Sequence, residues 1–365
     1  MSTTSVTSIV PHPRRHAVPH NTAASDPAPG ARAPGGATYR AIFVALAAAL
    51  ALPANAGLLR EGQAVRVIPL SIRDGDKPMV EASIGGRQGV LMFDNGTPDL
   101  LFLNRAALAL PEGRYLASGF AASGQAVHVQ AHPAPRISIA GQPLDLSGDV
   151  RSGDFGFTAP GLGTDFLGFI GTPMVADDAF LLDYRHRRLL VLQAGEDGAL
   201  AVASPGAPDV VVSVPFMLLP GEQPTIAASV GTLPFVTDFD TGDSGTLYAS
   251  AATRDRLRGQ GLLEPDGDRW RLGGLAIDGV GFAPTLVRLV IAGSPQDVRK
   301  TGHIDQLRLG ARFLSANPCL WNFPARTLTF LKPDATFLDA LATAGIDPPR
   351  SWASPVSAPA VPGAR

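Results

Sequence analysis

The chain of 365 residues contains a single cysteine, Cys319, so no disulfide can form within it. A lone cysteine between Pro318 and Leu320 is expected to be a small buried apolar residue rather than a nucleophile. Charged residues make up only 17% of the chain, and 30 Lys and Arg nearly balance 32 Asp and Glu. This balance indicates neither a nucleic-acid surface nor a strongly acidic partner. Without a disulfide, the fold must be stabilised by packing.

Residues 40–56 have the pattern of a secretion signal. A basic residue precedes the apolar stretch 41–52, and Ala-Asn-Ala at 54–56 supplies a small-residue cleavage site. The stretch is shorter than the roughly 20 residues that a bilayer-spanning helix requires. We therefore expect an exported protein, periplasmic or secreted, whose mature form begins at Gly57 and has no stable membrane span. Residues 1–39, rich in Pro, Ala, Ser and Gly, are expected to be a disordered N-terminal extension.

Short apolar runs separated by Gly, Pro and Asp-Gly turns fill both halves of the chain, and long amphipathic helices are scarce. This pattern predicts an all-β protein with many short strands. Residues 137–144 and 275–282 each fit a hairpin around a Gly-containing turn. The Pro- and Gly-containing segment 203–208 opposes helix and strand pairing, which makes it the expected linker between the halves. A short helix is expected at about 335–344, before a mobile tail.

The second half of the chain repeats the pattern of the first. Asp94-Asn95-Gly96 is followed 146 positions later by Asp240-Thr241-Gly242, and the apolar runs 65–72 and 211–218 align at the same shift. Each of these Asp residues follows an apolar strand, so the two motifs occupy equivalent places in a long repeat. A single Asp-x-Gly is mostly turn chemistry, whereas a matched pair indicates one shared site.

Further matches extend the repeat beyond these motifs. Asn104 meets Ser250 at the same shift, and both residues suit the N-cap of a short helix. Later the shift falls to 138 or 139, where Phe169-Ile170-Gly171 meets Arg308-Leu309-Gly310. An insertion of seven or eight residues in the first half explains this drift.

These residues resemble the pepsin and retropepsin family of aspartic proteases. In that family each lobe carries an apolar-apolar-Asp-Thr/Ser-Gly loop and, later, an apolar-apolar-Gly turn. The resemblance covers roughly residues 65–331 and is nearest to bacterial exported members with short lobes and no disulfides. It implies two similar acid-protease-like β-barrel lobes with a cleft between them. The N-terminal lobe would span 57–205, the C-terminal lobe 206–334, and a short helix with a disordered tail 335–365.

The resemblance implies an aspartic endopeptidase with Asp94 and Asp240 as its catalytic pair. Two adjacent carboxylates suit peptide hydrolysis without a metal or cofactor, since one takes a proton from water while the other gives one to the amide oxygen. Close together they cannot both ionise cheaply, so they share one proton and favour an acidic working pH. We expect a monomer that acts on a peptide or protein, with flap hairpins over the cleft at 118–124 or 265–270.

Neighbouring residues are expected to support the pair. Gly96 and Gly242 lack a Cβ where the two loops must approach each other and the substrate closely. In the family, the hydroxyl that follows each Asp also bonds across to the opposite loop, and Thr241 can do this. Thr97 is a usual residue at its place in the first loop.

Two departures from the family pattern leave another function open. Asn95 is longer and bulkier than a Ser or Thr, although its amide can still bond across the loops. Asp243 is a third carboxylate, which would raise the proton affinity of the pair if it pointed into the cleft. The alternative is therefore a catalytically silent relative that binds an extended peptide or envelope polymer by strand addition in the same cleft. A glycosidase is weaker, because only three Trp and four Tyr could stack on sugars.

Gly242-Asp243-Ser244-Gly245 also resembles the nucleophile loop of trypsin-like serine proteases, with His128 or His132 as a candidate base. Neither His stands in the Ala-Ala-His-Cys setting of that family, and this interpretation does not explain the matched aspartates. No metal site is expected either. The spaced histidines of the leader lie among prolines, where no helix would align them: His12, His16 and His20.

Overall fold

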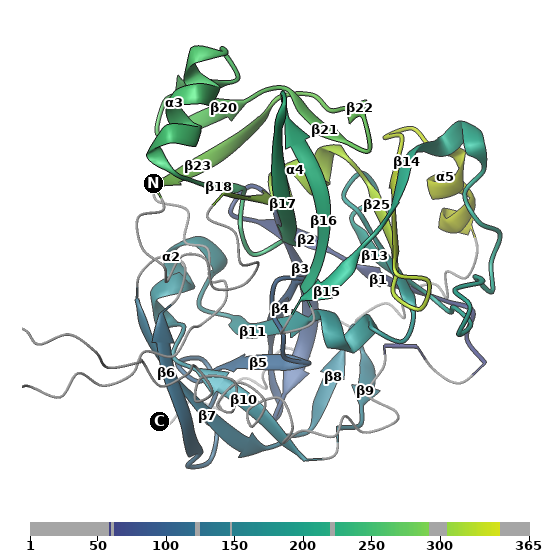
Figure 1. Ribbon diagram of the computed structural model, residues 1–365. Helices are drawn as coiled ribbons and strands as arrows, with labels where there is room; N and C mark the ends of the chain where they lie inside the picture. The colour runs from purple at the N-terminus through teal and green to yellow at the C-terminus, as the bar shows by residue number, and fades with distance from the viewer. Residues whose placement is uncertain are drawn as a thin grey trace, which may run out of the picture.

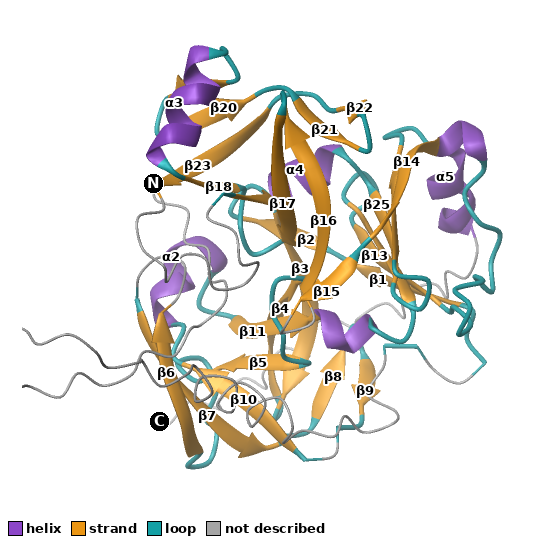
Figure 2. Cartoon of the chain, in the orientation of Figure 1, coloured by secondary structure: helices purple, strands orange, loops and turns teal. Residues whose placement is uncertain are grey.

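The computed structural model describes residues 58–59, 62–120, 125–146, 148–219, 223–291 and 305–343. The described chain is all-β in class, with strands in three sheets and only short helices (Figure 2). The predictions for residues 1–39 and 40–56 lie outside the described residues. Within the described ranges, no helix is long and apolar enough to cross a bilayer.

The bounds of the elements follow the chain in two matching series. The strands of the first half are β1 (Val65–Pro69), β2 (Ser71–Arg73), β3 (Lys77–Ile84), β4 (Arg87–Asp94), β5 (Leu101–Asn104), β6 (Arg114–Phe120), β7 (Ala126–Pro133), β8 (Ile137–Ile139), β9 (Gln142–Leu144), β10 (Asp149–Gly153), β11 (Phe166–Gly171), β12 (Ala179–Asp183) and β13 (Arg188–Leu192). Those of the second half are β14 (Val210–Pro215), β15 (Met217–Leu219), β16 (Gln223–Val230), β17 (Leu233–Asp240), β18 (Thr246–Ala249), β19 (Leu263–Asp266), β20 (Arg269–Leu272), β21 (Leu275–Ile277), β22 (Val280–Gly281), β23 (Thr285–Ile291), β24 (Gln306–Gly310), β25 (Cys319–Asn322) and β26 (Thr327–Leu331). The α-helices are α2 (Ala159–Leu162), α3 (Ala251–Gly259), α4 (Ala311–Ala316) and α5 (Thr336–Thr343).

Two ten-stranded sheets repeat one topology. The first runs β6-β7-β10-β5-β11-β4-β3-β8-β9, with β2 beside β3, and the second runs β19-β20-β23-β18-β24-β17-β16-β21-β22, with β15 beside β16. Most of the first sheet lies at the bottom of the view and most of the second at the top (Figure 1). Parallel pairing sets Asp94 opposite Gly171 in one sheet and Asp240 opposite Gly310 in the other. The sequence repeat therefore corresponds to a repeat of strand order.

A third sheet of six strands joins the two halves. Its order is β1-β13-β12-β25-β26-β14, so three strands come from each half. β12 and β25 pair antiparallel at the junction, with Phe180 opposite Trp321. Phe93, next to Asp94, contacts Phe180 at 5.2 Å between ring centroids, and Phe239, next to Asp240, contacts Trp321 at 4.7 Å. The strands that end at the two aspartates thus rest on one aromatic cluster at the junction.

Helix α5 packs on the other face of the six-stranded sheet, where Leu338 joins an apolar cluster with Leu181 and Leu320. The carboxylate of Asp209 accepts hydrogen bonds from the backbone N–H groups of Thr336 and Phe337, each at 2.9 Å, which satisfies the helix N-terminus. The predicted tail helix is therefore present, in nearly the predicted place.

The prediction of matched helices after Asn104 and Ser250 is half wrong. Ser250 caps α3, since its hydroxyl accepts a hydrogen bond from Thr253 N. A turn follows Asn104 instead. Its Oδ1 accepts a local bond from Ala106 N at 3.1 Å, but it also accepts from Phe155 N at 3.1 Å, and Nδ2 donates to Phe166 O at 2.9 Å. The predicted hairpins at 137–144 and 275–282 are confirmed as β8–β9 and β21–β22.

Candidate active site

The two loops that follow β4 and β17 meet at the junction of the halves. Asp94 and Asp240 are both fully buried, and their carboxyl groups interact directly. A Cβ on Gly96 would lie 2.6 Å from Cγ of Asp240, and one on Gly242 would lie 2.9 Å from Oδ2 of Asp94. Only glycine fits at either place without displacing the opposite carboxyl group.

Cross-loop hydrogen bonds clamp the pair from both sides. Thr241 Oγ1 donates to Phe93 O at 2.6 Å and accepts from Asn95 N at 3.1 Å. In return, Asn95 Oδ1 accepts from Thr241 N at 2.8 Å. Asn95 Nδ2 is buried and has no hydrogen-bond partner among the described residues. The Thr hydroxyl therefore makes two cross-loop bonds, while the Asn side chain makes one and leaves a buried donor unpaired.

The two carboxylates receive different hydrogen-bond donors. Asp94 accepts from Gly96 N at 2.9 Å and from Thr97 Oγ1 at 2.7 Å. Asp240 accepts through Oδ1 from the backbone N–H groups of Gly242 and Asp243, at 2.9 and 3.1 Å. No hydroxyl donor corresponding to that of Thr97 is present in the second loop, where Asp243 stands instead.

Arg308, from β24, contacts the Asp240 oxygen that receives no such hydroxyl. Its Nη1 lies 3.0 Å from Oδ2 of Asp240. Its Nε and Nη2 bind Asp238 at 3.1 and 2.6 Å, and all three side chains are buried. Our sequence reasoning gave neither Arg308 nor Asp238 a role. The signals were an arginine at the first apolar position of the expected Gly turn, and an aspartate two residues before Asp240, on the same face of the strand.

Asp94 and Asp240 together are called the dyad below. Burial raises the pKa of both of its carboxyls. The pKa of Asp240 is raised well above its usual range by burial and then by the charge of Asp94, while Arg308 lowers it. Asp243 also raises this pKa through its charge, although its carboxylate turns to its own loop. There it accepts from Gly245 N and from Thr246 Oγ1, each at 2.8 Å. The pair therefore retains a proton at a higher pH than an exposed aspartate would.

A lysine of the first half reaches the second dyad loop. Lys77 Nζ lies 2.6 Å from Oδ1 of Asp76 and 2.9 Å from Oγ of Ser244, and its side chain is 1% exposed. The two candidate histidines bind other serines: His128 pairs with Ser118 and His132 with Ser152. The structure thus does not bring Ser244 together with either histidine, as a trypsin-like arrangement would require.

The two flap candidates occupy equivalent places in the two sheets. Residues 265–270 turn between β19 and β20, with Pro265 opposite Trp270, and β6–β7 is the matching hairpin. The segment 118–124 lies at the end of β6–β7, and its residues 121–124 are outside the described residues.

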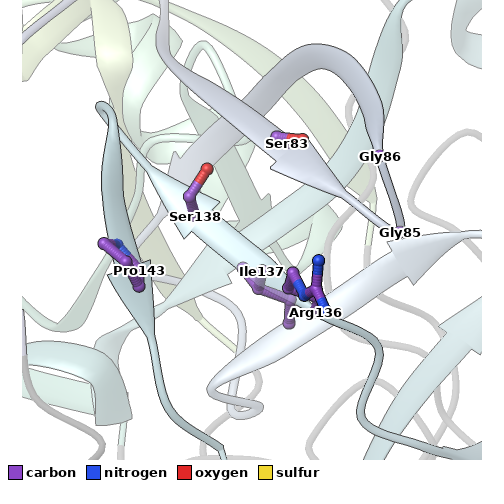
Figure 3. Close-up of a pocket in the computed structure, with 7 residues that line it drawn as sticks. All are labelled: Ser83, Gly85, Gly86, Arg136, Ile137, Ser138 and Pro143. Atoms are coloured by element: carbon purple, nitrogen blue, oxygen red, sulfur yellow. The ribbon is translucent and has the colours of Figure 1, made fainter.

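A separate hollow of about 540 Å³ lies along β3, β8 and β9 and the turn at Gly85–Gly86 (Figure 3). None of the residues that line it belongs to the dyad loops. Within the described ranges, no group of three or more His, Cys, Asp or Glu could hold a metal ion. His12, His16 and His20 lie outside those ranges.

All seven residues chosen from the sequence lie in the two meeting loops: Asp94, Asn95, Gly96, Thr97, Asp240, Thr241 and Gly242. The arrangement holds two carboxyl groups close together, with donors that fix the orientation of each. Such a pair can take one proton and give another in the same reaction. No protein-family model and no curated protein matches the chain.

Proposed function

We propose that the protein is an aspartic endopeptidase in which Asp94 and Asp240 activate water for attack on a peptide bond. The observation that carries the proposal is the close approach of two fully buried carboxyl groups on equivalent loops. The repeated strand order and the six-stranded sheet that joins the halves support a two-lobed, pepsin-like architecture with a substrate cleft. Since one chain supplies both carboxyls, a monomer can hold the whole site.

The chemistry follows from the single shared proton. As the water oxygen bonds to the carbonyl carbon, the ionised carboxylate accepts a proton from water and the protonated carboxyl gives its proton to the carbonyl oxygen. When the C–N bond breaks, the leaving nitrogen takes the proton gained from water. A hydroxyl of the tetrahedral intermediate then returns a proton to the other carboxylate, which restores the starting state. No metal or cofactor is needed for this sequence.

The expected export signal favours a substrate outside the cytoplasm. The segment 40–56 has a signal-like pattern, and Cys319 is buried, so no exposed thiol is offered by the described residues. We propose a peptide or protein of the periplasm or the exterior as the substrate.

The test is cleavage of a mixed peptide library by the mature protein from about pH 3 to about pH 7, with and without a statine-type inhibitor. Wild-type protein should cleave peptides at acidic pH, and the inhibitor should block this. Asp94→Asn and Asp240→Asn should each abolish cleavage, while the matched control Asp178→Asn, which removes another partly buried carboxylate, should retain it. Cleavage that persists in both dyad variants, or that only a serine-directed reagent removes, would overturn the proposal.

A second candidate is a catalytically silent protein that binds an extended peptide or envelope polymer at the same place. Two observations favour it: the unpaired Nδ2 of Asn95 and the contact of Arg308 with Asp240. Titration calorimetry with library peptides distinguishes the two functions. Binding without cleavage at any tested pH would support the silent protein.

A further inference from the structure

The charge on Arg308 makes the two dyad carboxyls chemically unequal. We propose that Arg308 is a positioning residue that holds Asp240 in its ionised form, so that the shared proton resides on Asp94. The assignment of catalytic roles rests on the proposed function, whereas the location of the proton does not. The inference stands on the geometry of three buried side chains on adjacent strands.

The position of the guanidinium is fixed by the sheet. Arg308 on β24 lies directly opposite Asp238 on the parallel strand β17. The Nε and Nη2 donors bind the two oxygens of Asp238 side by side, and this two-point contact orients the planar group. The third nitrogen, Nη1, then faces Asp240 Oδ2 at 3.0 Å. Because arginine stays protonated in proteins, this contact delivers a permanent positive charge.

The donors around both carboxyls favour the ionised form, and they favour it more strongly at Asp240, where one of them is a cation. Asp240 faces two backbone N–H groups and the cation, and all three interactions stabilise a carboxylate. Asp94 receives one backbone N–H and one neutral hydroxyl. The charge of Arg308 also lowers the pKa of Asp94, but among the described residues no cation forms an ion pair with it. The carboxyl with fewer and weaker donors is the one that keeps the proton.

Other charged groups near the site are occupied by nearer partners. Asp243 accepts two bonds within its own loop, and Lys77 is paired with Asp76. Asp94 raises the pKa of Asp240 through its charge, but only while Asp94 is itself ionised. Once Asp94 holds the proton, this repulsion vanishes. The attraction to Arg308 remains, and it is larger than the repulsion from either Asp243 or Asp238. The groups that face Asp240 or Arg308 are Asp94, Asp238, Asp243 and Tyr248.

The proton location assigns the two roles of the proposed reaction. Asp94 would be the acid that protonates the carbonyl oxygen of the scissile peptide bond. Asp240 would be the base that accepts the proton from water while the water oxygen bonds to the carbonyl carbon. In the second step Asp240 returns that proton to the leaving nitrogen, and Asp94 recovers its own from the intermediate.

Carbon-13 NMR of protein labelled at the aspartate carboxyl carbon tests the assignment without any substrate. Asp94→Asn leaves Asp240 as the single dyad carboxyl, and Asp240→Asn leaves Asp94. We expect Asp240 to titrate at least about one pH unit below Asp94, since a contacting arginine lowers an aspartate pKa by about one to three units. Titration of Asp240 at the same pH as Asp94, or above it, would overturn the inference.

A double variant, Asp238→Met/Arg308→Phe, supplies the second measurement in a protein that keeps both dyad carboxyls. It introduces the same two residue types, methionine and phenylalanine, that the first half has at the equivalent place as Met92 and Phe169. Both dyad titrations should move upward, by about one pH unit, and the acidic and basic limits of any peptide cleavage should move with them. A folded double variant with unshifted titrations would overturn the role of Arg308.

Cleavage by wild-type protein is measured in parallel, so the two proposals can fail separately. If the titration order is as expected but no peptide is cleaved, the protease assignment fails and the proton location stands. If peptides are cleaved and Asp240 titrates above Asp94, the protease assignment stands and the role of Arg308 fails.

Discussion

The two halves of the molecule share their strand order but differ in one pair of residues behind the dyad. In the first half, Met92 on β4 and Phe169 on β11 face each other. In the second half, Asp238 and Arg308 occupy the corresponding places on β17 and β24. One backbone arrangement therefore accommodates an apolar pair or a buried ion pair. The halves are alike in architecture and unlike in electrostatics.

The loops in front of the dyad differ in a related way. The Thr97 hydroxyl donates a hydrogen bond to Asp94, whereas the carboxylate of its counterpart Asp243 accepts hydrogen bonds from Gly245 and Thr246. Thr241 makes two cross-loop bonds through one oxygen, whereas Asn95 makes one and leaves Nδ2 unpaired. The comparison shows that Arg308 supplies to Asp240 what a neutral hydroxyl supplies to Asp94.

The largest expected effect comes from breaking the ion pair on one side. Arg308→Met leaves Asp238 buried without its cation, and such a loss destabilises a fold by about 3–5 kcal/mol. The double variant Asp238→Met/Arg308→Phe should cost far less, because apolar residues of similar volume can replace a buried pair. Urea unfolding measures both. Equal losses in the two variants would mean that packing, and not charge, decides this position.

A smaller loss is expected where the loops touch. Gly96→Ala places a methyl group 2.6 Å from Cγ of Asp240, so the loops must move apart at a cost of about 1–3 kcal/mol. Gly259→Ala is the matched control, since no atom outside its own helix lies within 4 Å of the added carbon. It should stabilise α3 by about 0.5–1 kcal/mol. Thermal unfolding of both proteins checks the difference, and a neutral Gly96→Ala would contradict the close approach.

The pH dependence of stability depends on carboxyls outside the two loops. Burial raises the pKa of Asp99 and Asp178 to about 6, so the folded state binds their protons more tightly than the unfolded chain. Stability should therefore rise as pH falls from 7 to 5, by about 2 kcal/mol in total. Asp165 and Asp209 have lowered pKa values, and the stability they contribute is lost at lower pH.

Melting temperature measured against pH checks this balance. We expect a maximum between about pH 4 and about pH 6, above the unfolded pKa of aspartate and below that of the two raised groups. Asp178→Asn should reduce the rise on acidification. A melting temperature that falls steadily from neutral pH would contradict the raised pKa values.

The smallest expected effect comes from making the two loops more alike. Asn95→Thr removes the unpaired Nδ2 and offers a hydroxyl in its place, so the free energy of unfolding should rise by about 1 kcal/mol. Thr241→Val is the converse change: it removes two cross-loop bonds and should lower stability. Chemical denaturation compares the two. Destabilisation by Asn95→Thr would show that the longer amide is needed to reach Thr241 N.

The sequence predicted what depends on local pattern and missed what depends on long-range partners. Turn residues and alternation predicted the β class and the hairpins, and Ser250 was a correct helix cap because its bond is local. Asn104 has the same capping chemistry and bonds Ala106 locally, but two further partners, Phe155 and Phe166, lie more than 50 positions away. The contact of Arg308 with Asp240 likewise joins two strands that are far apart in the sequence. The unusual arginine in the Gly turn marks the position but does not identify its partner.

Because β12 pairs with β25, each half supplies a strand that completes the sheet of the other. A fragment ending before β14 would expose β12 as an open edge, with backbone donors and acceptors and the apolar residues Phe180 and Leu181 uncovered. Two copies of such a fragment could pair along that edge and bring two copies of Asp94 together. In the full-length chain β25 covers this edge and prevents such self-association. Because one chain supplies both loops, their residues can differ, whereas a symmetric dimer of identical chains would have two identical loops.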